Sequence, residues 1–482
     1  MTYCRWKSFD YSGSGVEILE SLKAERLVFF LDSSLCDSPM GRYSFIGCDP
    51  FDVVQSKGPH TLEILRNKFK QYQEKESGSP ASCPSPFPAG IAGFLGYDFG
   101  LYLENIKLCS ADDLNLPDCL FGFYDCVITI DHQAHKLYIS SSGLPESDPL
   151  LREKRAKQRL EQIVQKLSLE SQKVEEIASE PMEPGHEGLI WSYLKSNFTQ
   201  EAYCRAIEKA LDYIRRGDIY QVNLSQRFTL DLSPPWEHCE AIRIYQRLRM
   251  LSPSHFGGYF DGGNFQILSS SPERFLYLKD GKVQTRPMKG TRPRGKNSLE
   301  DKIYREELLN SAKDKAELLM ITDLERNDLG RVCDYDSIKV KEMRAIEEYR
   351  TVFQATSTIE GVLQEGKDGF DLLSACFPGG SITGCPKIRA MEIIEELEPQ
   401  RRGLYTGCLG YMSFDGRMDF NILIRTMLMC GQKIHFQVGG GIVADSVPSK
   451  EYQETLVKAK AMAQCLNQQF FHPSYSISKK CD

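Results

Sequence analysis

Short apolar segments separated by only a few turn residues constrain the fold of this chain more than any other feature. They occur at residues 220–230, 255–260, 265–270 and 283–286, with Gly and Asp between them. These spacings are too short for the crossover helices that parallel strands need. We therefore expect a mostly antiparallel sheet.

Further strands and several helices are predicted along the chain. Glycine-flanked apolar segments at 41–47 and 90–97 predict strands, and the alternation over 126–141 predicts a hairpin. Helical spacing of apolar residues is found at 148–169, 202–215, 299–327, 368–375, 385–397 and 450–470. The predicted fold class is α+β, with layered antiparallel sheets, a β-sandwich, flanked by helices.

The length of 482 residues allows two domains or one elaborate domain. A stretch rich in Glu, Ser and Pro begins at Ser171 and suggests a junction between two parts. We expect an N-terminal region, a linker, a catalytic domain and a C-terminal tail, which span residues 1–170, 171–194, 195–470 and 471–482.

Composition excludes several classes of protein. Hydrophobic residues make up 41% and charged residues 26%, as in an ordinary globular protein, and the net charge of −7 comes without basic runs that would bind nucleic acid. The 16 cysteines are spread along the chain without a C-x-x-C pair, so we expect thiols. No signal peptide or membrane-spanning apolar run is present, which predicts a cytoplasmic protein.

Lys289 lies in the most distinctive local motif, Pro287-Met288-Lys289-Gly290, which has three arginines nearby. A solvated basic loop is the simpler interpretation of this motif taken alone. Pro287 and Gly290 nevertheless restrict the backbone on both sides, and neighbouring cations favour the neutral amine that a nucleophile requires. Lys289 is therefore a candidate nucleophile.

Carboxylates at helical spacing form a second candidate feature. Asp314 and Glu317 are three residues apart in one predicted helix, and Glu451, Glu454 and Lys458 share a stripe of another. Solvated salt bridges would explain either group alone. Hard oxygen ligands from two separate helices suit Mg²⁺, which keeps some waters and accepts substrate oxygens.

Glycine-rich segments and one isolated charge indicate an anion site. The segment 377–387 leads into a predicted helix, and Gly439-Gly440-Gly441 forms a second run, although neither has the spacing of a phosphate-binding loop. Arg425 is the one charge in an apolar segment that we expect to be a strand. It is either paired internally or directed at an anionic ligand, and we favour the ligand.

Taken together, these segments resemble the chorismate-utilising enzymes, a family that includes anthranilate, aminodeoxychorismate, isochorismate and salicylate synthases. In the second half of the chain the resemblance is carried by Gly217–Ser225, Ser271–Phe275, the Lys289 motif, the Glu317 helix, Pro378–Lys387, the Arg425 segment and Gly439–Lys458. In the first half it is carried by Gly41–Gly47 and Gly90–Tyr97. The resemblance implies the chorismate-utilising enzyme fold.

Two positions indicate the branch of the family. Aminodeoxychorismate synthases carry lysine at the position of Lys289, where anthranilate synthases carry alanine. Gln221 stands where isochorismate and salicylate synthases have the lysine that activates water, and glutamine cannot be that base. The resemblance therefore implies amination at the fourth ring carbon, with anthranilate synthase or a non-catalytic binding scaffold as alternatives. Gln354 departs from the family pattern, because it replaces a histidine common among relatives and cannot titrate near neutrality.

The resemblance also implies roles for individual residues. Lys289 is the covalent nucleophile and Glu273 the acid for the departing hydroxyl, while Glu317 and Glu454, with Glu451 close by, hold Mg²⁺. Chorismate binding falls to Thr383, Gly384, Tyr405, Arg425, Gly439, Gly440, Gly441 and Lys458. A pocket for tryptophan is implied at Asp32, Ser33, Arg42, Tyr43 and Ser44, with aspartate in place of the usual glutamate.

The source of nitrogen is expected to be a second protein. The chain contains no Gly-x-Cys-x-Gly elbow of a glutaminase, and the nearest string, Gly407-Cys408-Leu409-Gly410, has the wrong order. The resemblance implies ammonia from a separate glutamine amidotransferase subunit and a downstream lyase that releases 4-aminobenzoate.

Overall fold

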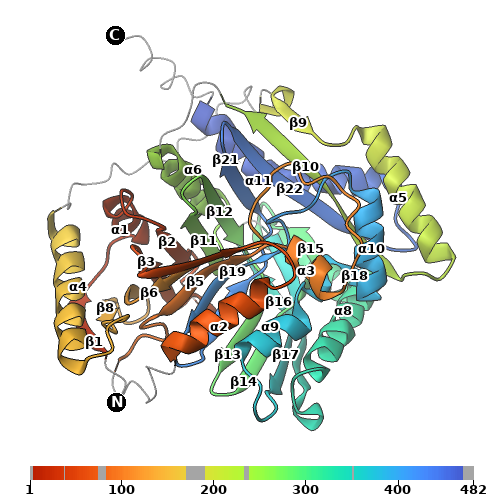
Figure 1. Ribbon diagram of the computed structural model, residues 1–482. Helices are drawn as coiled ribbons and strands as arrows, with labels where there is room; N and C mark the ends of the chain where they lie inside the picture. Colours follow the sequence, from red (N-terminus) through yellow and green to blue (C-terminus); the bar gives the residue numbers. More distant parts are fainter. Residues whose placement is uncertain are drawn as a thin grey trace.

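Two large antiparallel sheets organise the chain (Figure 1). The structure is a computed structural model that describes residues 4–36, 38–73, 83–169, 190–232, 238–349 and 352–470. The predicted tail and most of the predicted linker lie outside these residues. The described end of the linker enters a short 3₁₀ helix, Ile190–Ser192, and β9 (Leu194–Ser196).

The first sheet has 12 strands. In spatial order these are β1 (Arg5–Asp10), β8 (Lys136–Ser141), β7 (Cys126–Asp131), β3 (Tyr43–Gly47), β2 (Phe29–Asp32), β11 (Phe256–Asp261), β12 (Phe265–Ser271), β21 (Thr426–Cys430), β22 (Lys433–Ile442), β10 (Gln221–Asp231) and β18 (Gly384–Cys385), with β9 also paired to β10. Its pairings are antiparallel, as the short spacings predicted.

The second sheet has 10 strands. Their order is β15 (Met288–Pro293), β17 (Val352–Val362), β14 (Lys282–Thr285), β13 (Arg274–Lys279), β20 (Met418–Asn421), β19 (Cys408–Ser413), β5 (Gly90–Leu95), β6 (Cys119–Tyr124) and β4 (Asp52–Ser56), with β16 (Lys339–Glu348) also paired to β17. This sheet lies against the first and completes the predicted sandwich.

Both sheets combine strands from the two regions that the sequence separates at 171–194. In the first sheet β2 pairs with β11, and in the second β5 pairs with β19. The N-terminal region therefore shares continuous backbone hydrogen bonding with the catalytic region. The division into regions stays a prediction from sequence, and both regions contribute to one sandwich.

Helices cover the outer faces of the sandwich (Figure 1). They are α1 (Gly15–Ser21), α2 (Thr61–Gln73), α3 (Asp98–Leu103), α4 (Pro149–Leu169), α5 (Gln200–Arg215), α6 (His238–Leu251), α7 (Ser298–Asn310), α8 (Ala312–Gly330), α9 (Gly369–Cys376), α10 (Lys387–Leu397) and α11 (Pro448–Phe470). Helices α6 and α11 contact the first sheet, and α7 and α8 contact the second. None of the helices in the described ranges is long and apolar enough to cross a membrane.

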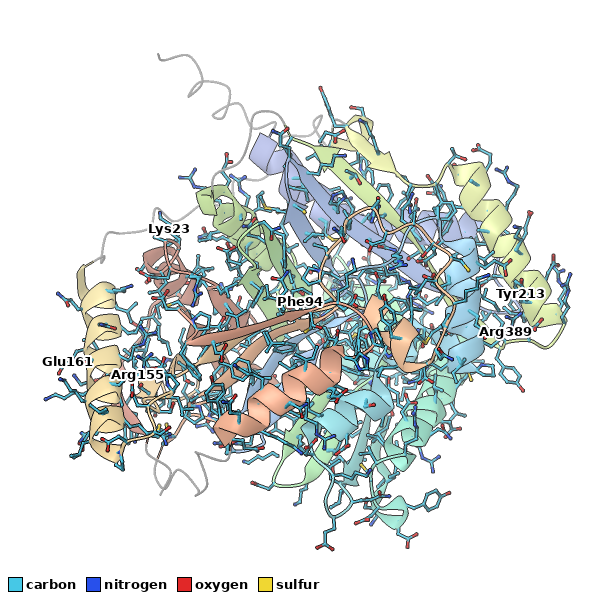
Figure 2. All side chains as sticks on the ribbon, viewed as in Figure 1. Lys23, Phe94, Arg155, Glu161, Tyr213 and Arg389 are labelled. Carbon is cyan, nitrogen blue, oxygen red and sulfur yellow. The ribbon has the colours of Figure 1, made fainter. Side chains whose placement is uncertain are left out.

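Aromatic side chains fill the space between the two sheets. Phe94 of β5 is fully buried, packs edge-on against Phe260 and Phe265, and lies near the centre of the molecule in Figure 2. Phe87 and Tyr411 stack with their ring centroids 4.3 Å apart in the same cluster. The described cysteines are free thiols, as expected.

Two predicted helices begin or end differently from the prediction. The segment 299–327 forms α7 and α8, because Ser311 leaves the helical conformation at ψ 113° and its hydroxyl accepts a hydrogen bond from the Asp314 amide. Such a side chain competes with helix continuation. Cys385 lies in β18, and α10 begins at Lys387, because the residue before Pro386 is disfavoured in the helical region.

Gly93→Ala is expected to destabilise the fold by about 3 kcal/mol, because overpacking a tight core costs roughly 1–3 kcal/mol or more. A Cβ at this position would lie 2.0 Å from the carbonyl oxygen of Leu120 on the neighbouring strand. Urea unfolding measures the change. Gly330→Ala is the control, since its Cβ would meet nothing closer than 4.0 Å. Equal stability of the two variants would contradict the packing argument.

Candidate active site

Lys289 and Glu273 are joined through a single residue, Ser381. The Lys289 ammonium group donates to the backbone oxygen of Ser381 at 2.8 Å, and the Ser381 hydroxyl donates to Oε1 of Glu273 at 2.6 Å. Ser381 lies in a 3₁₀ turn, Gly380–Ile382, that follows α9. The sequence places these three residues in three separate motifs. The fold brings the predicted nucleophile and the predicted acid into contact with one serine.

Burial controls the protonation of this pair. It lowers the pKa of Lys289, against the opposing negative charges of Glu317 and Glu273. It also raises the pKa of Glu273 to about 7, although the Ser381 hydroxyl and Lys289 act in the other direction. Each group is therefore moved toward neutrality, as a general acid and a nucleophilic amine require.

The cause that the sequence suggested for the reactivity of Lys289 is wrong. The neighbouring arginines are each bound to a carboxylate: Arg292 to Asp314 at 2.9 Å and Arg294 to Asp301 at 2.5 Å, with Arg286 bound to Glu347. A guanidinium group that is paired with a carboxylate forms a nearly neutral pair, so it lowers the pKa of a nearby amine only slightly. Desolvation lowers the pKa of Lys289, and the nearest cation that adds to the effect is Lys458.

The three predicted metal ligands face one another from α8 and α11. The carboxylates of Glu317 and Glu451 lie 3.8 and 4.0 Å from the same ammonium group, that of Lys313, and Glu454 pairs with Lys458 at 2.8 Å. Burial raises the pKa of Glu317, and Glu451 adds to the rise. Lys458 holds the pKa of Glu454 below its usual value.

This donor set fits a divalent cation that keeps an open coordination sphere. Within the described ranges, no group of three or more acidic, His or Cys side chains is placed to hold a metal ion by itself, and lysine ammonium groups supply the positive charge among the glutamates. Mg²⁺ needs only one or two protein carboxylates when a substrate provides further oxygens. The glutamates are hard oxygen donors on two helices, so their chemistry fits Mg²⁺, and its binding stays a prediction.

Gly439, Gly440 and Gly441, the second predicted glycine run, lie in β22. Their lack of side chains leaves room that other groups use. A Cβ on Gly440 would lie 3.5 Å from Oε2 of Glu451, and one on Gly441 would lie 2.3 Å from Nε2 of Gln221. The absence of side chains at these glycines therefore leaves space for the glutamates and for Gln221 beside the strand.

Two glutamines have buried polar atoms without hydrogen-bond partners. Both amide atoms of Gln221 are buried and unpartnered within the described structure, and so is Oε1 of Gln354. Nε2 of Gln354 is 3.4 Å from the Thr291 hydroxyl, two residues beyond Lys289. Leaving such groups unpaired is costly, which makes them candidate contacts for a polar ligand.

Arg425 lies between β20 and β21 with φ 49°, and not in a strand as predicted. No hydrogen bond or ion pair of its guanidinium is found among the described residues, and burial lowers its pKa against the charges of Tyr349 and Glu273. The ligand interpretation is consistent with this unpaired state. A buried cation of this kind is stabilised by an anion.

The remaining predicted chorismate contacts lie around the same residues. Lys458 donates to the Gly439 carbonyl at 2.9 Å, and the ring of Tyr405 lies 5.6 Å from the Arg402 guanidinium. The Thr383 hydroxyl donates to the Gly379 carbonyl at 3.0 Å, so it serves the loop itself. Gly384 pairs with β10 and presents only backbone. Their roles toward chorismate stay predictions.

The predicted tryptophan pocket is a separate cavity of about 470 Å³ between the two sheets. Asp32, Ser33 and Tyr43 line it, whereas Arg42 binds Asp131 at 2.8 Å outside the lining. Oδ2 of Asp32 accepts from Tyr245 at 2.9 Å and from Arg249 at 2.5 Å, and its other oxygen is buried without a partner. The Ser44 hydroxyl accepts from the Ser33 amide at 3.0 Å. Tryptophan binding stays a prediction.

Comparison with known proteins identifies the family. The model of the chorismate binding enzymes matches residues 31–464. The chain belongs to the chorismate-binding enzyme family. It is 39% identical to "Aminodeoxychorismate synthase component 1" of Bacillus subtilis, over 88% of this chain and 89% of that protein. It is 41% identical to "Anthranilate synthase component 1" of Thermus thermophilus, over 90% and 91%.

A solved structure of a chorismate-binding enzyme has the same fold. Anthranilate synthase component I from Streptococcus pneumoniae matches with a TM-score of 0.73 and 31% identity, over 89% of this chain and 93% of that one. This confirms the predicted α+β class and the chorismate-utilising fold. The relatives divide between two aminating activities, so similarity alone does not choose the product.

Glu317→Gln is expected to weaken Mg²⁺ binding by about 100-fold, because affinity at hard-oxygen sites follows the number of anionic ligands. Isothermal titration with Mg²⁺ and the rate of chorismate consumption at limiting Mg²⁺ both measure the change. Asp323→Asn on the same helix is the matched control, since its carboxylate pairs with Arg326 at the surface. Unchanged binding and rate in the Gln variant would refute the ligand assignment.

Proposed function

We propose that this protein is the large subunit of an aminodeoxychorismate synthase, which converts chorismate and ammonia to 4-amino-4-deoxychorismate for 4-aminobenzoate synthesis. The observation that carries the proposal is the position of Lys289. Its amine is desolvated, and Ser381 connects it to the buried carboxyl of Glu273. A nucleophile and an acid held by one residue can act on the same substrate from adjacent positions.

The first half-reaction forms a covalent adduct. The neutral amine of Lys289 attacks the second ring carbon. The two conjugated ring double bonds shift, and the carbon–oxygen bond at the fourth carbon breaks. Glu273 gives its proton to the departing oxygen, which leaves as water. Glu317 and Glu454, with Glu451 close by, would hold Mg²⁺, which offsets the charge of the ring carboxylate and makes the ring an electron acceptor. Arg425 offers an unpaired cation to a carboxylate of chorismate.

The second half-reaction reverses the displacement with a different nucleophile. Ammonia attacks the fourth carbon, the two ring double bonds return to their original positions, and the bond between Lys289 and the second carbon breaks. The proton that the new ammonium group loses returns Glu273 to its acid form, so the cycle consumes chorismate and ammonia and releases water and product. Gln221 and Gln354 cannot activate water or exchange protons, which supports amination over hydration.

Ammonia is proposed to come from a glutamine amidotransferase subunit. The relatives are named as component 1 of their enzymes, which fits a protein that works with a second component. The proposal keeps the cytoplasmic location predicted from the sequence, because the reaction uses soluble metabolites and the described cysteines are free thiols.

Anthranilate synthase is the second candidate function. It is favoured by the 41% identity to a protein of that name. Lys289 argues against it, because direct attack of ammonia at the second ring carbon needs space where the lysine side chain lies. The position of the amino group on the product, para or ortho, separates the two.

Withholding ammonia is expected to let an adduct accumulate on Lys289, detected as a mass increase equal to chorismate minus water on the peptide that spans Arg286 to Arg292. Lys289→Ala is expected to lose the adduct and most para-amination, by about 100-fold or more, with a trace of ortho-amination. Lys289→Arg is expected to be equally inactive, because guanidinium stays protonated. Full para-amination by Lys289→Ala, with no adduct on the parent, would exclude the covalent mechanism.

Ammonium salts at alkaline pH are expected to support turnover by the purified chain, whereas glutamine is not, because the chain lacks a glutaminase motif. Product formation with each nitrogen source measures this. Adding a glutaminase subunit is expected to restore the use of glutamine. Glutamine-dependent turnover by the rigorously purified single chain would contradict the proposed division of labour.

A further inference from the structure

Glu325 is a buried carboxyl group that the proposed reaction does not use. It lies on α8, eight residues after Glu317, and only 6% of its surface is exposed. The cation whose charge reaches it, Lys387, is bound to Asp328 at 2.7 Å. A carboxyl group in this position has to be stabilised by hydrogen bonding or remain neutral.

The contacts of Thr285 determine how Glu325 is protonated. The Thr285 hydroxyl oxygen lies 2.8 Å from Oε2 of Glu325 and 2.7 Å from the backbone oxygen of Phe275. A hydroxyl has one proton, and a carbonyl oxygen can only accept. Both contacts are full hydrogen bonds only if Thr285 donates to Phe275 and Glu325 donates to Thr285. The geometry therefore requires a protonated carboxyl group at Glu325.

Glu325 also lies beside the loop that holds the acid. A Cβ on Gly380 would lie 3.5 Å from Cγ of Glu325, and Gly380 precedes the serine whose hydroxyl binds Glu273. The charged groups that face Glu325 are Glu273, Asp328 and Lys387. Burial, aided by the charge of Glu273, raises the pKa of Glu325 to about 8, which agrees with the hydrogen-bond count.

We infer that Glu325 is a neutral acid that donates through Thr285 to the carbonyl of Phe275 and so positions Glu273, two residues earlier in the chain. The inference rests on the proposed role of Glu273 as the acid. The chain of donors has one direction, from α8 through β14 to β13, and it ties the helix that carries the predicted metal ligand Glu317 to the segment that carries the acid. Loss of the Glu325 proton leaves Thr285 with two acceptors and one proton, so one contact breaks.

An infrared pH titration of the ligand-free protein, labelled with ¹³C-glutamate, tests the protonation state directly. Two carboxylic-acid signals are expected, one lost at about pH 7 and one at about pH 8. Glu273→Gln is expected to remove the first, and Glu325→Gln the second. Persistence of the second signal in Glu325→Gln, or its absence from the parent protein, would overturn the inference.

The positioning role is tested by the rate of adduct formation on Lys289 without ammonia, measured from about pH 6 to about pH 9.5. The parent rate is expected to fall above about pH 7, where the acid Glu273 loses its proton, and to fall more steeply above about pH 8, where Glu325 also loses its proton. Glu325→Gln, which still donates but cannot ionise, is expected to be about threefold slower at neutral pH and to lose only the second, steeper fall. Thr285→Val is expected to be about tenfold slower, and Thr285→Ser to recover the rate.

The outcomes separate this inference from the proposed function. Asp323→Asn on α8 is the control for a change of charge on the helix surface. A steeper fall above about pH 8 that is identical in the parent and in Glu325→Gln would overturn the positioning role. Absence of any adduct in the parent, together with a neutral Glu325 in the infrared titration, would refute the covalent reaction and leave the protonation state supported.

Discussion

The buried guanidinium of Arg402 is the contact on which the arrangement of the site depends. Only 1% of its side chain is exposed, and it donates to the Glu398 carboxylate at 2.8 Å, to the Ile382 carbonyl at 2.9 Å and to the Asn223 carbonyl at 2.6 Å. The Tyr97 ring, from the N-terminal region, lies 4.8 Å from it. Removing one partner of a buried ion pair typically costs about 3–5 kcal/mol. The Ser381 turn, β10 and the N-terminal region are therefore fixed relative to one another.

The site separates charge into regions with different tasks. Negatively charged glutamates and positively charged lysines lie side by side on α8 and α11. The glutamates suit a divalent cation, and the lysines suit the carboxylates of a dianionic substrate. Around Lys289 and Glu273 the surroundings are desolvated, and both groups are moved toward neutrality. Proton transfer and nucleophilic attack both need groups of this kind. The proposed site thus combines a charged part, suited to binding, with a less polar part, suited to reaction.

The sequence predicts many of the strands and most of the helices, because apolar periodicity can be recognised without a structure. It also supplies the candidate reacting residues, whose roles stay predictions. It cannot predict contacts that depend on a single backbone angle. Arg425 reads as part of a strand, yet its φ of 49° directs the side chain elsewhere. The sequence assigns Gly439 to Gly441 no secondary structure, yet they pair with β10 as part of a strand. The role of Ser381 is hidden because its two partners are more than 90 residues away in the chain.

The sharing of both sheets between the two ends of the chain has a consequence for synthesis on the ribosome. Strand β2, Phe29-Phe30-Leu31-Asp32, is an interior strand only because β11 covers one side of it, and β5 likewise depends on β19. Until those later strands leave the ribosome, the early strands are apolar edges with unpaired backbone, the state in which chains pair with one another and aggregate. Such distant pairings also close long loops, which slows folding. The continuity that makes the finished sandwich rigid therefore makes the nascent chain dependent on protection.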